Sequence, residues 1–183
     1  MTAEAATPRL VILDRDGVVN QDSPEFVKSP DEFLPLPGSL EAIADLSRAG
    51  YTVVIASNQS GLARGLLDDD DLEEIHAKLD VLLAELGGSI DSVFICPHGP
   101  DDGCECRKPA PGLFAQIAAH YGVSMDGVPA VGDSVRDLVA ARAAGATPVL
   151  VRTGNGADAE SASAAAGVNT YDNLAAFVEA LLA

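Results

Sequence analysis

The stretch Leu10-Val11-Ile12-Leu13-Asp14-Arg15-Asp16-Gly17 decides the fold of this chain. Its first four residues are apolar and branched, which is typical of a strand buried in a parallel sheet. Because Gly17 ends the strand, Asp14 and Asp16 are expected at its carboxyl end, the edge where open α/β sheets bind ligands. Two adjacent carboxylates repel each other unless a cation or a shared proton relieves them. We therefore predict metal binding, nucleophilic attack or proton transfer here, against the alternative of a simple aspartate-rich turn.

Two later apolar runs, residues 52–56 and 128–131, also open into small and polar residues. The first ends in Ser57-Asn58-Gln59-Ser60-Gly61 and the second in Gly132-Asp133-Ser134. Between them, Arg107-Lys108-Pro109 precedes a helix-like stretch. This ordered set of acid pair, hydroxyl, lysine and acid resembles the four motifs of the haloacid dehalogenase superfamily of phosphotransferases, and the resemblance covers nearly the whole chain.

Strand-like and helix-like segments alternate along the chain, which predicts a parallel sheet covered by helices on both faces. We expect an α/β fold of the three-layer, Rossmann-like type in one domain, residues 1–183, because no repeat or linker divides the sequence. The expected strands are 10–13, 52–56, 92–96, 128–131, 147–151 and 169–171. The expected helices are 39–49, 68–86, 111–121, 135–144, 157–166 and 174–182.

Composition limits the classes of partner. The formal net charge of −17 argues against sequence-independent binding to nucleic acid and against an anionic membrane surface. No apolar stretch is long enough to span a bilayer, and Met1–Pro8 does not have the pattern of a signal peptide. We therefore expect a cytoplasmic protein, and a monomer, since no long exposed apolar stripe requires a partner.

All three cysteines lie close together, in Cys96-Pro97-His98 and Cys104-Glu105-Cys106. An odd number of cysteines argues against a disulfide framework. Three thiolates and one imidazole are a complete tetrahedral ligand set for zinc, which favours a structural Zn²⁺ without an open position for water. Free thiols, or a redox pair of Cys104 and Cys106, remain alternatives.

The cysteine motif narrows the resemblance. Cys-x-His followed by Cys-x-Cys-Arg-Lys-Pro resembles the subgroup that contains heptose bisphosphate phosphatases and the similar histidinol phosphatases. The stretches Asp14–Gly17, Ala63-Arg64-Gly65 and Arg107-Lys108-Pro109-x-Pro111-Gly112 agree with it. Members of this subgroup lack a large cap domain, and no insertion here is long enough to form one. Ser57 stands where many relatives have Thr, which keeps the hydroxyl.

The resemblance implies that Asp14 attacks phosphorus and forms an aspartyl-phosphate, while Asp16 protonates the leaving oxygen and later activates water. Ser57 can donate a hydrogen bond to a phosphoryl oxygen. Lys108 can neutralise the nucleophile and the phosphoryl group, and Arg107 can hold phosphate in a bidentate grip. An exposed lysine at a helix start is the alternative for Lys108.

Magnesium prefers oxygen ligands, and the resemblance implies that Asp14, the backbone carbonyl of Asp16, and Asp133 hold it. Asp137 is expected to support Lys108 rather than to bind the metal. Arg64 is a candidate for binding a second phosphate. The full set of expected substrate contacts is Asp22, Ser23, Pro24, Glu25, Ser57, Asn58, Gln59, Ser60, Arg64, Arg107, Lys108 and Ser134.

These implications favour a magnesium-dependent phosphatase that cleaves the 7-phosphate of D-glycero-D-manno-heptose 1,7-bisphosphate. Such an enzyme would serve the synthesis of ADP- or GDP-heptose for lipopolysaccharide or another surface glycan. A histidinol-phosphate phosphatase is the alternative with the same chemistry. A zinc-stabilised module that binds phosphorylated ligands without catalysis is the alternative of another class.

Overall fold

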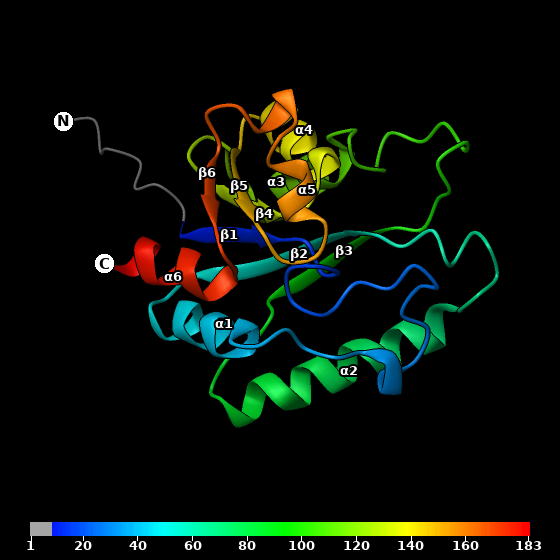
Figure 1. The fold of residues 1–183 in the computed structure, drawn as a ribbon. Helices are drawn as coiled ribbons and strands as arrows, with labels where there is room; N and C mark the ends of the chain where they lie inside the picture. Colours follow the sequence, from blue (N-terminus) through cyan, green and yellow to red (C-terminus); the bar gives the residue numbers. More distant parts are fainter. Residues whose placement is uncertain (1–8) are drawn as a thin grey trace.

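The computed structural model describes residues 9–183 as a six-stranded parallel sheet with helices on both faces (Figure 1). The strand order is β3-β2-β1-β4-β5-β6. The order reverses at β1, so β1 and β4 flank a topological switch point, where open α/β sheets bind ligands. The strands are β1 Leu10–Leu13, β2 Thr52–Asn58, β3 Ser92–Cys96, β4 Pro129–Gly132, β5 Thr147–Val151 and β6 Asn169–Tyr171.

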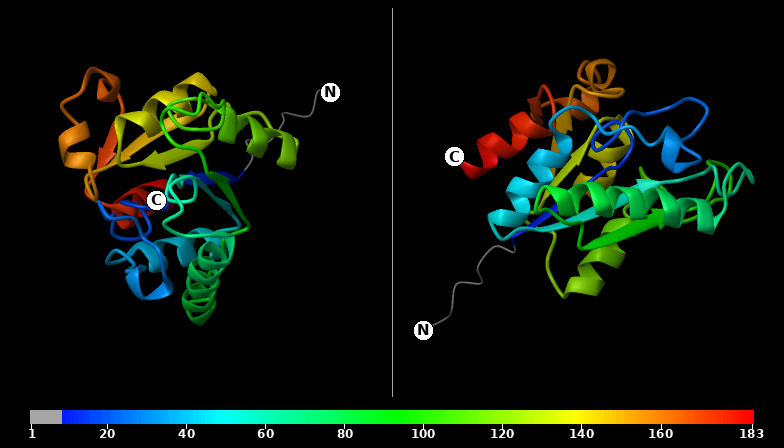
Figure 2. Two further views of the ribbon diagram at one scale, coloured as in Figure 1. Left: turned by 90° about the vertical axis from the view of Figure 1, so that its right-hand side faces the viewer. Right: turned by 90° about the horizontal axis from the view of Figure 1, so that it is seen from below.

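Two helical layers cover the sheet, as the view along it in Figure 2 shows. One layer holds α1 (Ser39–Arg48), α2 (Asp69–Glu85) and α6 (Leu174–Leu182). The other holds α3 (Gly112–Tyr121) and α4 (Val135–Ala143). The expected three-layer α/β class is therefore confirmed, and the described connections contain no large cap domain.

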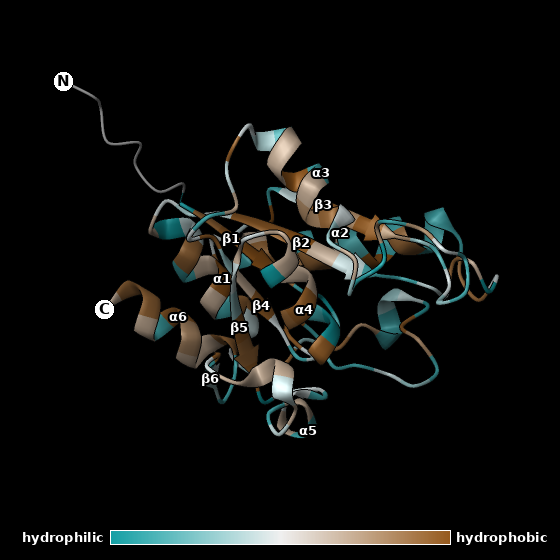
Figure 3. Ribbon diagram, turned by 90° about the horizontal axis from the view of Figure 1, so that it is seen from above, coloured by the Kyte–Doolittle hydropathy of each residue, from teal (hydrophilic) through white to brown (hydrophobic). Residues whose placement is uncertain are grey.

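The central strand explains why both layers form. Val11 and Leu13 belong to the apolar cluster beneath α1, α2 and α6, whereas Leu10 and Ile12 belong to the cluster beneath α3 and α4. All four side chains are buried, as period-2 alternation in a strand covered on both faces requires. Figure 3 shows hydrophobic (brown) residues along the central strands and hydrophilic (teal) residues mainly in the loops.

One predicted helix, 157–166, is wrong. The structure has a short helix α5, Gly156–Ala159, and a separate 3₁₀ turn, Ser163–Ala165. The Ser161 hydroxyl donates to the Asp158 carbonyl, and the Ala162 N–H donates to the Ala159 carbonyl rather than continuing the α-helical pattern. Serine side chains compete in this way with helical backbone bonds. A second 3₁₀ turn, Pro30–Glu32, lies between β1 and α1.

The remaining elements differ from expectation by one or two residues at an end. The largest difference is in β2, which continues two residues beyond the expected end to Asn58, and β4 is shifted by one residue to Pro129–Gly132. Residues 1–8, where no signal peptide is expected, lie outside the described residues. Within residues 9–183, every helix is too short or too polar to traverse a bilayer.

Candidate active site

A cavity of about 270 Å³ opens at the carboxyl edge of the sheet. It collects side chains from the ends of β1, β2 and β4, from the loop before α3, and from the loop after β5. The lining residues are Asp14, Asp16, Asp22, Ser23, Phe26, Val27, Asn58, Gln59, Ser60, Arg64, Arg107, Lys108, Asp133, Ser134, Arg136, Asp137 and Asn155.

Lys108 lies at the centre of the charged groups. Its Nζ is 3.2 Å from Asp14 Oδ1 and 2.6 Å from Asp137 Oδ1, and it donates to the Ala56 carbonyl at 2.8 Å. Asn58 fixes its backbone through two reciprocal hydrogen bonds, each 3.0 Å. Burial lowers the pKa of Lys108, but the carboxylates of Asp137 and Asp14 outweigh burial and raise it. The ammonium group therefore stays charged. Lys108 is only 3% exposed, which excludes the alternative of an exposed lysine.

We call Asp14, Asp133, Asp137 and Lys108 the acidic centre. Carboxylate oxygens of its three aspartates lie within 4.8 Å of one another. Both carboxylate oxygens of Asp137 already have partners. Oδ1 pairs with Lys108, and Oδ2 accepts hydrogen bonds from the hydroxyl and the N–H of Ser134 at 2.6 and 3.0 Å. This agrees with its expected role as a support for Lys108.

Asp14 and Asp133 are the carboxylates left short of positive charge. Burial raises the pKa of Asp14 well above its usual value, although Lys108 opposes the rise. Burial also raises the pKa of Asp133 to about 6, against the N–H of Asn155. Two buried carboxylates and the half-buried Asp14 share one ammonium, so a bound divalent cation would balance the site. The donor set is all oxygen and fits Mg²⁺.

Close packing explains why glycines surround Asp133. A Cβ added to Gly17 or to Gly154 would lie 2.1 Å from Asp133 Oδ2, and both glycines have positive φ angles. The loop after β1 and the loop after β5 therefore meet over this carboxylate. The Thr153 hydroxyl fastens them by donating to the Gly17 carbonyl at 2.6 Å.

Asp16 accepts hydrogen bonds from three side chains. Arg15, fully buried, donates from Nε and Nη2 to Oδ1 at 3.1 and 3.0 Å. Asn20 donates to Oδ1 at 2.9 Å, and Gln59 donates to Oδ2 at 2.7 Å. The other guanidinium nitrogen of Arg15 lies 3.5 Å from His76 Nε2. Burial, followed by the charge of Arg15, lowers the pKa of His76 to about 4, so the imidazole is neutral at pH 7.

Some of the expected substrate contacts do not line the cavity or have hydroxyl groups that are already hydrogen-bonded. Ser57 is buried just behind the cavity, where its Oγ accepts from Gln59 Nε2 at 2.9 Å. Ser134 lines the cavity, but its hydroxyl is bound to Asp137. Pro24 and Glu25 do not line the cavity, and Glu25 faces a separate surface hollow.

Asn155 is the clearest residue that sequence reasoning missed. Its N–H and its side-chain amide donate to Asp133 Oδ2 at 2.8 and 3.2 Å, and the amide also donates to Asp22 at 3.1 Å. Its position in Gly154-Asn155-Gly156, directly after a strand, was a usable signal. Phe26, Val27 and Arg136 also line the cavity and carried no motif.

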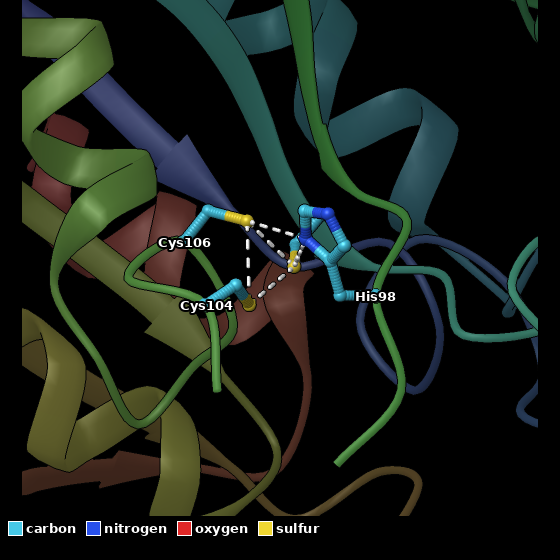
Figure 4. Close-up of side chains that lie close together, drawn as sticks. His98, Cys104 and Cys106 are labelled. Atoms are coloured by element: carbon cyan, nitrogen blue, oxygen red, sulfur yellow. Dashed lines mark hydrogen bonds between the residues drawn. The ribbon is translucent and has the colours of Figure 1, made fainter. Parts of the chain in front are cut away.

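A second group, which we call the cysteine cluster, consists of Cys96, His98, Cys104 and Cys106 (Figure 4). Their ligand atoms all lie within 4.8 Å of one another. The Cys104 sulfur is 3.7 Å from each of the other two sulfurs, while Cys96 and Cys106 are 2.8 Å apart. Tetrahedral zinc with Zn–S bonds of about 2.3 Å needs sulfur separations near 3.8 Å, so the last pair would separate by about 1 Å. The donor set fits zinc.

The cysteine cluster adjoins the cavity through the next two residues. Arg107 donates from Nη1 to the His98 carbonyl at 3.1 Å, and Lys108 follows it in the chain. The position of His98 in the cluster therefore helps to orient the Arg107 side chain, and Lys108 is the next residue in the chain.

Comparison with known proteins finds relatives that are HAD-like hydrolases or phosphatases. Residues 105–177 match the HAD-hydrolase-like family model. The chain is 58% identical to the D-glycero-beta-D-manno-heptose-1,7-bisphosphate 7-phosphatase of Bordetella bronchiseptica, covering 95% of this chain and 98% of the relative. It is 54% identical to the enzyme of the same name from Pseudomonas aeruginosa, covering 94% and 97%.

Solved structures agree. The crystal structure of D,D-heptose 1,7-bisphosphate phosphatase from B. bronchiseptica, complexed with magnesium and phosphate, superposes with a TM-score of 0.93 at 59% identity, over 94% of this chain and 97% of that chain. The Burkholderia thailandensis enzyme of that name gives 0.73 at 42% identity, over 95% and 98%. A chain with these relatives and with an acidic centre at the sheet's switch point is a phosphatase, and it belongs to the D-glycero-beta-D-manno-heptose-1,7-bisphosphate 7-phosphatase family of HAD-like hydrolases.

Proposed function

We propose that the protein is a magnesium-dependent phosphatase that removes the 7-phosphate of D-glycero-D-manno-heptose 1,7-bisphosphate through an aspartyl-phosphate. The observation that carries the proposal is the acidic centre, in which Asp14 and Asp133 face a cavity and Asp14 pairs with Lys108. The names of the relatives support the substrate, and they favour the β anomer.

Asp14 is the nucleophile. Lys108 Nζ lies 3.2 Å from Asp14 Oδ1, and its charge opposes the rise in the pKa of Asp14 that burial causes. The bond from Asp14 to phosphorus forms as the bond from phosphorus to the sugar oxygen breaks. Lys108 also places positive charge beside the phosphoryl group, where charge has to be stabilised during transfer.

Asp16 moves the proton. In the first half-reaction its protonated carboxyl gives a proton to the leaving sugar oxygen, and in the second its carboxylate takes one from the attacking water. Gln59, which donates to Asp16 Oδ2 and to Ser57 Oγ, connects the proton donor to the serine that we assign to a phosphoryl oxygen. Arg15 and Asn20 orient the carboxylate.

Two metals complete the assignment. We assign Mg²⁺ to Asp14, Asp133 and the Asp16 carbonyl, and when bound it supplies positive charge that polarises the phosphoryl oxygens. The relative's complex with magnesium and phosphate supports this assignment. We assign structural zinc to the cysteine cluster, from which Arg107 and Lys108 are directed into the cavity.

Cations near the substrate argue against histidinol phosphate. Arg64, Arg107 and Arg136 line the cavity together with Lys108, and they suit a second anionic group better than the amine of histidinol phosphate. We further propose one domain, a monomer and a cytoplasmic location, where thiols remain reduced and available to zinc. Its product would feed nucleotide-activated heptose synthesis.

The test is phosphate release from heptose 1,7-bisphosphate and from histidinol phosphate, each with magnesium and with chelator. We expect magnesium-dependent turnover that strongly favours the bisphosphate. Preference for histidinol phosphate would overturn the substrate assignment. Binding of phosphate esters without any turnover would overturn the enzymatic assignment in favour of a binding module. The Asp14→Asn variant serves as the control for contaminating phosphatase.

A further inference from the structure

The cavity concentrates the few cations of an acidic protein. The chain has 11 Lys and Arg residues and a net charge of −17. Four of the 11 line this single cavity, namely Arg64, Arg107, Lys108 and Arg136. Such a concentration is expected where an anionic ligand binds.

Most Lys and Arg side chains of the protein already have polar partners. Outside the cavity, each Lys or Arg side chain contacts a carboxylate or a backbone carbonyl. Within it, Lys108 is fully bound and Arg107 donates from Nη1 to His98. Among residues 9–183, Arg64 and Arg136 are the two cations with neither a hydrogen bond nor an ion pair to protein. Arg64 still has a partner in the Phe26 ring, 5.6 Å away, which leaves Arg136 as the cation with the most binding capacity to spare.

The position of Arg136 distinguishes it further. Arg136 follows Ser134 and Val135 at the start of α4 and lines the cavity. A second hollow of about 290 Å³ lies along that loop, beside Gly99, Gly103 and Cys104. Arg107, Lys108 and Arg136 line both spaces, so they mark the junction between them. Arg64 lines only the first of the two.

We propose that Arg136 is a specificity-determining residue that, with Arg107, binds the second phosphate of the substrate, the one that is not transferred, at this junction. The proposal rests on the proposed function, because it takes a sugar bisphosphate as the ligand. Lys108 and Asp14 occupy the reacting end of the cavity. The second phosphate then points toward the hollow along the cysteine loop, where two guanidinium groups can each present paired N–H donors. Sequence reasoning favoured Arg64 for this role.

The experiment measures binding in the Asp14→Asn background, so that no ligand is consumed. Calorimetry compares heptose 1,7-bisphosphate with heptose 7-phosphate, which lacks the anomeric phosphate. We expect Arg136→Gln to reduce the preference for the bisphosphate by roughly tenfold to a hundredfold, as for loss of a charged hydrogen bond. Arg136→Lys should restore part of the preference for the bisphosphate, because lysine returns the positive charge without the paired N–H donors of the guanidinium group.

Two further variants provide the comparison. Arg64→Gln removes the other unpartnered cation, and Arg48→Gln removes an exposed cation of α1 that pairs with Asp45 outside the cavity. Arg48→Gln should leave the preference within about twofold, the size of a distant screened charge, and Arg64→Gln should lower the preference less than Arg136→Gln does. An unchanged preference in Arg136→Gln, or a larger loss in Arg64→Gln, would overturn the inference. Turnover by the wild-type enzyme decides the proposed function separately, because the binding ratio is measured without catalysis.

Discussion

The acidic centre and the cysteine cluster are both close groups of ligating side chains, yet the chain builds them differently. Asp14 and Asp133 are far apart in sequence and meet because β1 pairs with β4. The cysteine cluster comes from residues 96–106 alone, on the end of β3 and a glycine-containing loop. The sheet therefore positions the first site, whereas the second depends on the path of one local segment of the chain.

Their charges differ as well. The acidic centre has an internal cation, since Lys108 lies within 3.2 Å of Asp14 and within 2.6 Å of Asp137. The cysteine cluster has no cation within it, and burial raises the pKa of Cys96 to about 12. A bound metal would stabilise a thiolate at Cys96, while Asp14 already has a cationic partner in Lys108. The comparison teaches that one site is prebuilt by the sheet, whereas we propose that the other is assembled around its ion.

The largest expected effect is on catalysis at the prebuilt site. Asp14→Asn should lower kcat by at least about a thousandfold, because it removes the nucleophile. Its circular dichroism and its zinc content should match the wild type, since the cysteine cluster is built independently. A variant with more than a tenth of wild-type kcat would contradict the mechanism.

Removing the internal cation should cost most in stability. Lys108→Met leaves Asp14 and Asp137 buried without it, and we expect a loss of about 3–5 kcal/mol in the free energy of unfolding by urea. Lys28→Met is the matched control, because Lys28 pairs with Glu32 at the surface and should cost at most about 1 kcal/mol. Equal losses in the two variants would show that the acidic centre is not held by Lys108.

The assembled site predicts a smaller and more local effect. Cys104→Ser should abolish bound zinc and lower kcat/KM about 10- to 100-fold, because Arg107 and Lys108 lose their support. Cooperative unfolding of the sheet should persist. Asp101→Asn, on the same loop but outside the ligand set, should keep both zinc and activity. Global unfolding of Cys104→Ser would break the comparison, because the cluster would then hold the whole domain.

The smallest effect concerns pH. The pKa of Asp133 is raised to about 6, so the folded state binds more protons than the unfolded state between about pH 4 and 6. The metal-free protein should therefore lose stability as pH rises through this window, and Asp14 acts in the same direction. Asp133→Asn should remove its part of the loss and raise the metal-free stability at pH 7 by on the order of 2 kcal/mol.

Thermal unfolding from pH 4 to pH 7, in chelator, measures this difference. With saturating magnesium the order should reverse, because the wild type binds the ion more tightly. A variant less stable than the wild type throughout, with chelator, would show that Asp133 is not short of positive charge.

The sequence predicted what depends on local pattern. Short apolar runs predicted five of the six strands, all but the edge strand β6, and the spacing of Cys96 to Cys106 predicted a cluster that the structure brings together. The helix at 157–166 failed because alanine content does not reveal that Ser161 competes for a backbone carbonyl.

Site residues beyond the motifs depend on tertiary contacts. Asn155 reaches Asp133 only through the meeting of two loops, and His76 reaches Arg15 across the packing of α2. Neither contact can be recognised from the spacing of residues in the sequence. Pro24 and Glu25 were expected from resemblance, and the path of the loop after β1 keeps both out of the cavity lining.

The clustering of cations in an acidic protein has a consequence for ionic strength. An anionic substrate approaching from bulk meets the repulsion of a body with net charge −17 before it reaches Arg107 and Arg136. Salt at about 0.1 M has a screening length near 10 Å, so it weakens the distant repulsion more than the contacts inside the cavity. Association should therefore accelerate with the first additions of salt, opposite to the behaviour of an enzyme whose whole surface attracts its substrate.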